Sequence, residues 1–105
     1  MKFVEPPVFT QAVVKLLDDE DYRLLQLALL LQSELGRLIR GSGGLRKMRW
    51  SLPGRGKRGG IRVIYYLDRT SETFYMLNVF RKNVQEDLTK QQLRILSRLV
   101  REEFG

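Results

Sequence analysis

The strongest secondary-structure signal in this 105-residue chain is a β-hairpin in its second half. Ile61 to Leu67 (IRVIYYL) is dominated by β-branched and aromatic residues, which predicts a strand. Asp68 to Glu72 is typical of a hairpin turn, and Thr73 to Arg81 is again rich in strand-forming residues. Leu45 to Trp50 alternates in polarity and predicts a third strand ahead of the hairpin. Three consecutive antiparallel strands form a meander, around which the other elements have to pack.

The N-terminal third of the chain predicts a short strand followed by two helices. Phe3 to Pro6 is the expected strand, which the prolines end. Val8 to Leu17 carries apolar residues at helical spacing. The acidic run Asp18 to Asp21 supplies an N-cap and a favourable first turn, so we interpret it as capping rather than as a metal site. The second helix is expected from about Asp19 to Glu34, with Gly36 as its C′ residue.

A last helix is predicted at the C-terminus. Thr89 and Gln92 match a capping box, and Leu88 and Leu93 have the spacing of a hydrophobic staple. The expected fold is therefore α+β, in one domain over residues 1–105: a short N-terminal strand, two helices packed on an antiparallel β-meander, and a C-terminal helix.

Positive charge is concentrated in the middle of the chain. Nine Lys or Arg and no Asp or Glu lie between Arg37 and Arg62, whereas the whole chain has a net charge of +7. A surface of this kind favours a polyanionic partner, which is nucleic acid, an acidic protein or an anionic membrane surface. The absence of acidic residues within the run favours a binding surface over an ordinary solvated face.

The composition excludes several kinds of chemistry. The chain has no cysteine and no histidine, so it has no disulfide, thiolate nucleophile or imidazole base. We expect no metal ion and no cofactor. The N-terminus lacks the pattern of a signal peptide, and the apolar run from Leu24 to Leu31 is too short to cross a bilayer, so a cytoplasmic protein without a membrane partner is expected.

Arg62 is the most informative charged residue because it interrupts an otherwise apolar strand. Burial of a guanidinium is costly unless it is paired or faces a cleft, and the sequence leaves both alternatives open. In an antiparallel meander, Arg62 lies near the end of the next strand, where Arg81 and Lys82 are found. Lys47 and Arg49 on the preceding strand are expected to join them. Such a cluster is able to stabilise the charge of a phosphoryl transition state.

Two features of this site are left open by the residues. The glycine-rich segment Ser51 to Gly60 contains Arg55, Lys57 and Arg58, and it is either a phosphate-binding loop or a linker kept soluble by charge. RNA would supply its own 2′-hydroxyl as nucleophile, but no general base is evident. A lysine among other cations is one candidate for the base, because like charges lower its pKa. Tyrosines that stack on bases or transfer protons are other candidates, namely Tyr65, Tyr66 and Tyr75. Tyrosines in strands are, however, more often core residues.

Three segments together resemble a known protein family: GGLRKMR, GKRGGIRVIYYLD and FYMLNVFRKNVQEDLT. They are similar to the RelE/ParE toxin superfamily, and specifically to HigB-type toxins of type II toxin–antitoxin pairs. The resemblance is close from about Gly41 to Leu99 and covers the N-terminal part only by order of elements. It implies a metal-independent endoribonuclease that cuts mRNA in the ribosomal A site and is inhibited by a HigA-like antitoxin, encoded by the adjacent gene.

The resemblance also implies roles for individual residues. The strand arginine of the family corresponds to Arg62. The basic residue that follows the last strand corresponds to Lys82 or Arg81. The paired basic residues on the preceding strand correspond to Lys47 and Arg49. We therefore predict a catalytic set and an RNA-binding set; the first is Arg62, Lys82, Lys47 and Arg49, and the second is Arg46, Arg55, Lys57, Arg58 and Arg81. Leu88 stands near the place where some members have a tyrosine, which leaves the general base unassigned.

Two other functions are compatible with parts of this pattern. A ParE-like protein inhibits DNA gyrase by binding and needs no RNA-facing basic cluster, so the charge run argues against it. A nucleic-acid-binding module without catalysis would bind with strong salt dependence and leave mRNA intact.

Overall fold

The computed structural model describes residues 1–51 and 60–104, and its centre is a five-stranded mixed sheet. The strands lie in the order β1 (Lys2–Val4), β5 (Thr73–Arg81), β4 (Ile61–Asp68), β3 (Leu45–Trp50) and β2 (Arg37–Leu38). The predicted meander is confirmed, because β4 pairs antiparallel with both β3 and β5. β1 lies parallel to β5 at one edge.

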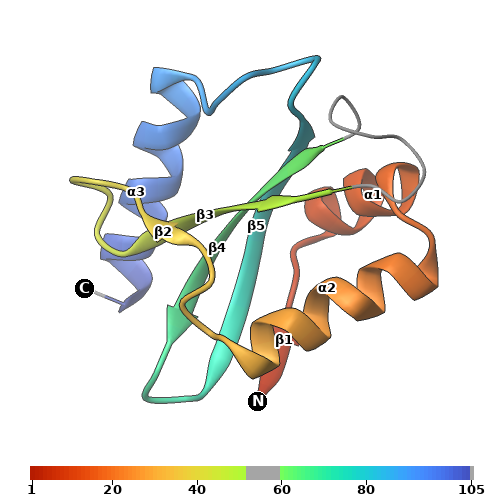
Figure 1. The fold of residues 1–105 in the computed structure, drawn as a ribbon. Coiled ribbons are helices and arrows are strands. Elements are labelled where there is room, and N and C mark those ends of the chain that lie inside the picture. The colour runs from red at the N-terminus through yellow and green to blue at the C-terminus, as the bar shows by residue number, and fades with distance from the viewer. Residues whose placement is uncertain (52–59, 105) are drawn as a thin grey trace.

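Three helices cover the two faces of this sheet. α1 (Pro7–Leu16) and α2 (Asp19–Leu31) lie on one side, and α3 (Lys90–Phe104) lies on the other (Figure 1). The predicted α+β class is confirmed. Within residues 1–51 and 60–104, no helix has the length and apolar character needed to span a bilayer.

Each face of the sheet has its own core, because β4 is apolar on both sides. Val63 and Tyr65 pack with Phe9 and Leu25 under α1 and α2, whereas the neighbouring Ile64 packs against Val100 of α3. β4 therefore has no exposed side chain and forms the centre of the sheet.

A bulge in β5 changes which side chains share a face. Ile64 pairs with Asn78, but the next residue, Tyr65, pairs with Met76, so β5 has one extra residue at this point. The following part of the strand is shifted in phase, which places Phe80 opposite Arg62 on the α3 face. Arg81 consequently points to the α1–α2 face, and Lys82 follows on the same side as Arg62.

Three predicted boundaries were wrong. The first strand is Lys2–Val4 rather than Phe3–Pro6, because Pro6 is already the N-cap of α1. α2 ends at Leu31, earlier than the predicted Glu34, and Gly36 is not its C′ residue. Instead the Gly36 N–H donates to the Tyr65 hydroxyl at 2.9 Å, in the segment that leads to the short strand β2. That strand was not predicted.

The capping box at the start of α3 is confirmed. The Gln92 N–H donates to Thr89 Oγ1, and the Thr89 N–H donates to Gln92 Oε1, both at 3.0 Å. Leu88 and Leu93 pack against the core beneath α3. The connection from β5 to α3 is thereby tied to the end of the sheet.

Candidate functional site

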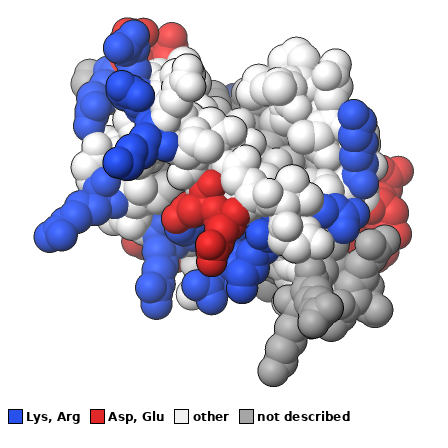
Figure 2. All heavy atoms as spheres, turned by 90° about the horizontal axis from the view of Figure 1, so that it is seen from above, with Lys and Arg blue, Asp and Glu red and all other residues white. Residues whose placement is uncertain are grey.

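An open hollow of about 420 Å³ lies at the end of the sheet where β3 finishes, β4 begins and β5 leads toward α3. All four residues of the predicted catalytic set line it, together with two carboxylates. The described residues that line the hollow are Lys47, Arg49, Arg62, Lys82, Glu86 and Asp87. Viewed from above Figure 1, this side of the molecule has acidic side chains near the middle with basic side chains around them (Figure 2). The structure thus brings together residues from β3, β4 and the β5–α3 connection.

Strand register positions the basic residues. Arg49 and Arg62 are directly opposed across β3 and β4, and Lys47 is opposed to Ile64 on the same face. Like charges directly opposite one another destabilise a sheet. Lys82 is held beside them because its N–H donates to the Gly60 carbonyl oxygen at 3.1 Å. The fold therefore tolerates a local repulsion that an anionic ligand would relieve.

Arg62 is buried, with 7% of its surface exposed, yet it forms no ion pair with any of the residues that the structure describes. Its Nη1 contacts the Ile61 carbonyl oxygen at 3.4 Å, and no carboxylate of residues 1–51 or 60–104 lies within 4.0 Å of the guanidinium. Of the two alternatives left open by the sequence, this arrangement agrees with an arginine that faces a cleft. A guanidinium that is largely removed from water, with no carboxylate within ion-pair distance in the described part of the chain, attracts an anion strongly.

Lys47 is paired with a carboxylate of the same hollow. Lys47 Nζ lies 2.9 Å from Asp87 Oδ2, and Asp87 Oδ1 accepts a hydrogen bond from the Leu88 N–H at 2.8 Å. The hydrogen bond from Lys47 lowers the pKa of Asp87 below its ordinary value of 3.8; the Leu88 N–H and the charges of Lys47 and Arg62 add to this effect, and burial opposes it. Asp87 is therefore ionised and orients Lys47 toward the hollow.

This ion pair predicts a contribution to stability that depends on pH. Because the folded state lowers the pKa of Asp87, the contribution is complete above the unfolded pKa and is lost as the pH falls through the folded pKa. We expect the free energy of unfolding of the wild type to fall more steeply below about pH 4 than that of Asp87→Asn. The difference should stay below about 1 kcal/mol, since the pair is solvent-accessible. Urea denaturation between about pH 2 and pH 6 measures it; equal acid dependence of both proteins would contradict it.

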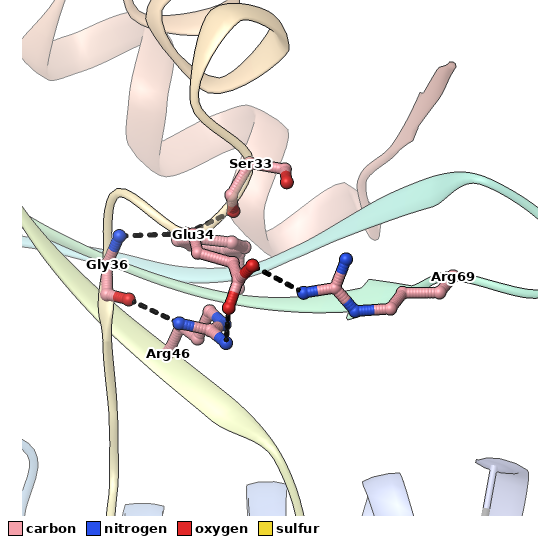
Figure 3. Close-up of polar contacts among 6 residues, drawn as sticks. Ser33, Glu34, Gly36, Arg46 and Arg69 are labelled. Carbon is pink, nitrogen blue, oxygen red and sulfur yellow. Dashed lines mark hydrogen bonds and ion pairs between the residues drawn. The ribbon is translucent and has the colours of Figure 1, made fainter.

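The structure does not bring the whole predicted RNA-binding set to this hollow. Arg46 points to the opposite face, where its guanidinium donates to the Gly36 carbonyl oxygen at 2.8 Å and pairs with Glu34 at 3.1 Å, as Figure 3 shows. Arg69 binds the other oxygen of the Glu34 carboxylate at 2.9 Å. With 12% of its side chain exposed, Arg46 stabilises the segment after α2, and this geometry favours a structural role. Its assignment to RNA stays a prediction.

Arg81 is also separated from the cluster. It is opposite Ile61 on the α1–α2 face, because the bulge in β5 shifts the strand by one residue. Of the two candidates for the basic residue after the last strand, Lys82 is the one beside Arg62. The loop residues of the RNA-binding set lie outside the described residues; they are Arg55, Lys57 and Arg58.

The three candidate tyrosines are packed against other parts of the protein. Tyr65 is fully buried, and its hydroxyl bonds backbone groups. Tyr66 and Tyr75 pack against Phe104 of α3, with ring centroids 4.6 and 4.8 Å apart, respectively. Tyr65 is thus a core residue, Tyr66 and Tyr75 are partly buried beside α3, and none of the three lines the hollow.

Sequence reasoning missed four side chains near the site. Glu86 and Asp87 line the hollow itself, and Arg37 and Arg40 line a neighbouring hollow of about 570 Å³ that shares Lys47 and Arg49 with it. A signal for the two carboxylates was present, since they lie between Lys82 and the predicted cap at Thr89. The connection between β5 and α3 is bonded to the sheet at Lys82 and to α3 at Thr89, so it passes the end of the sheet.

A protein-family model matches residues 30–104 of the chain. The matched family is described as the RelE toxin of the RelE / RelB toxin–antitoxin system. The match runs from the end of α2 through α3, so it includes the whole hollow and every residue that lines it.

Proposed function

Because this chain belongs to the RelE toxin family and is a toxin of a toxin–antitoxin system, we propose that it is an endoribonuclease that cleaves mRNA in the ribosomal A site. The observation that carries this proposal is the hollow at the end of the sheet. It gathers four cationic side chains, among them a buried arginine with no carboxylate within ion-pair distance in the described part of the chain. A scissile phosphate is the ligand that such a site fits best.

In the proposed reaction, the 2′-hydroxyl of the RNA attacks the adjacent phosphorus atom. The phosphorus passes through a pentacoordinate state with additional negative charge on its oxygens. Arg62 and Arg49 offer planar guanidinium donors to these oxygens, and the ammonium groups of Lys47 and Lys82 add point charges. Preorganised donors of this kind lower the barrier by stabilising charge that develops only in the transition state. Since RNA supplies the nucleophile, the proposed reaction uses no metal ion and no cofactor.

The neighbouring hollow extends the proposed RNA path along β3. Arg37 of β2 lies opposite Lys47 of β3 in the strand register, so both residues are on the same face of the sheet. Together with Arg40, it continues the positive charge away from the site where cleavage is proposed. We assign these two arginines to phosphates that flank the scissile one, where they would contribute affinity and little to the rate.

Several finer features belong to the same proposal. The HigB-type subgroup, a HigA-like antitoxin from the adjacent gene, a cytoplasmic location and one toxin domain over residues 1–105 follow from the sequence pattern. The antitoxin would block access of the ribosome to the basic face or cover that face directly. Sequencing of the neighbouring reading frame and copurification of its product test the pairing.

Primer extension on mRNA from a translating extract tests the proposal. We expect new 5′ ends in register with codons when the purified protein is added, and none when translation initiation is blocked. Intact mRNA together with strongly salt-dependent RNA binding would instead indicate a binding module without catalysis. A gyrase supercoiling assay on the same preparation tests the ParE-like alternative, for which inhibition without mRNA cleavage is the expected result.

A further inference from the structure

The hollow proposed to bind RNA contains two carboxylates, which weaken its attraction for a polyanion. Glu86 and Asp87 are adjacent in the chain and both line the hollow with the four cations. A surface that only binds RNA gains nothing from negative charge at its centre, since each carboxylate repels the phosphates. Their position therefore indicates a chemical role or a structural one.

The two carboxylates differ in what they contact. Both oxygens of Asp87 are occupied, one by Lys47 and one by the Leu88 N–H. Glu86 is solvent-exposed and makes no side-chain hydrogen bond or ion pair with residues 1–51 or 60–104. Asp87 thus has a structural role in holding Lys47, whereas the Glu86 carboxylate is available to a ligand in the hollow.

The reaction needs a group that accepts the proton of the 2′-hydroxyl, and the chain has few residues of the right type. It has no histidine and no cysteine, and its strand tyrosines are packed elsewhere. Lys47 is already engaged, since its Nζ bonds the Asp87 carboxylate. We propose that Glu86 is the general base of the cleavage reaction. This inference rests on the proposed function.

The Glu86 carboxylate takes the proton from the 2′-hydroxyl, the 2′-oxygen forms a bond to phosphorus, and the bond from phosphorus to the 5′-oxygen breaks. The leaving 5′-oxygen takes a proton from the Lys82 ammonium, which lies in the same hollow. The products are a 2′,3′-cyclic phosphate and a 5′-hydroxyl. Proton exchange with water then restores Glu86 and Lys82.

The test compares cleavage and binding in the same variant. General base catalysis contributes about 10²–10⁴-fold to a rate, so Glu86→Gln should slow single-turnover mRNA cleavage on programmed ribosomes by at least about 100-fold. Binding to ribosomes that carry an mRNA with a 2′-deoxy nucleotide at the cut site should be unchanged or tighter, because a negative charge is removed. Glu86→Asp should retain part of the activity. Glu102→Gln on the exposed end of α3 makes the same charge change away from the hollow and serves as the matched control.

The pH dependence separates a carboxylate base from a lysine base. The charged groups of the described residues that line the hollow with Glu86 are Lys47 and Arg49 from β3, Arg62 from β4, and Lys82 and Asp87 from the connection to α3. Carboxylates titrate well below neutral pH and lysines above it, so the cleavage rate should be flat between about pH 6 and pH 8. A tenfold rise per pH unit would indicate a lysine base and overturn the inference.

Each remaining outcome is decisive. Cleavage by Glu86→Gln at the wild-type rate would overturn the role of Glu86 and leave the proposed function intact. If Glu86→Gln lost ribosome binding and cleavage to the same extent, the role of Glu86 as general base would also be overturned, because Glu86 would then act on binding. If the wild type itself leaves mRNA uncut, the proposed function fails and the inference fails with it.

Discussion

Replacing Arg62 with alanine is expected to lower the rate of mRNA cleavage by about 10²–10³-fold, the loss typical of one preorganised transition-state donor. Among the described cations that line the hollow, only Arg62 is buried, and no carboxylate in that part of the chain pairs with it. Its charge is therefore screened least by solvent and should act most strongly on the developing negative charge. Single-turnover cleavage on programmed ribosomes measures the rate.

Two further variants separate the charge of Arg62 from its packing. Arg62→Met keeps the length and apolar stem of the side chain, so it should be inactive as well but fold at least as stably as the wild type. Arg98→Ala on the exposed face of α3 makes the same change in net charge as Arg62→Ala and should cleave normally. Wild-type cleavage by Arg62→Met would show that the guanidinium is not needed for the chemistry.

The largest effect on stability is expected from Tyr65→Phe. The Tyr65 ring is fully buried, and its hydroxyl donates to the Ser33 carbonyl oxygen and accepts from the Gly36 N–H, both at 2.9 Å. Loss of the hydroxyl leaves these two backbone groups without partners. The Gly36 N–H is buried, whereas the Ser33 carbonyl oxygen is part-buried. At about 1–3 kcal/mol for a buried unsatisfied group and less for a part-buried one, the free energy of unfolding should fall by roughly 2–4 kcal/mol. That corresponds to a drop in Tm of about 10–20 °C for a chain of this size.

Tyr22→Phe is the matched control for this prediction. The Tyr22 hydroxyl donates to a Glu5 carboxylate at a half-buried site, so the partner left behind can be hydrated by water. Its loss should cost less than about 1.5 kcal/mol. Urea denaturation measures the free energy of unfolding of both variants. An equal decrease for the two would show that the hydrogen bonds of Tyr65 to Ser33 and Gly36 stabilise the fold no more than the Tyr22–Glu5 bond does.

Tyr65 also connects stability to the site. Its hydroxyl fixes the segment between α2 and β2, which the Glu34–Arg46 pair holds from the other side (Figure 3). The ring leaves no room beyond Gly36, since a Cβ at that position would lie 2.7 Å from Tyr65 Cε1. β2 then pairs with β3 and places Arg37 beside Lys47. Formation of this edge of the basic face therefore depends on a buried tyrosine on the opposite face.

The sequence alone was sufficient for the elements whose signals are local. The two strands of the hairpin, the strand before it and the capping box of α3 were all predicted correctly, because their residue patterns extend over several positions within one element. The same reasoning drew attention to Arg62, since an arginine inside an apolar strand is unusual wherever that strand packs; its catalytic role stays a prediction. Element ends were predicted less well: α2 stops before Glu34 because Tyr65, 32 residues after Ser33, bonds the chain there.

The tertiary structure decided which side chains meet. One extra residue in β5 turns Arg81 away and leaves Lys82 beside Arg62, and no local pattern in the strand marks that bulge. The two-residue strand β2 exists only through its pairing with β3. Glu86 and Asp87 enter the hollow because their connection is tied to the sheet at Gly60 and to α3 at Thr89. The periodicity of the sequence specifies whether a segment is a helix or a strand. The strand register and the connections between distant elements specify which side chains lie next to one another.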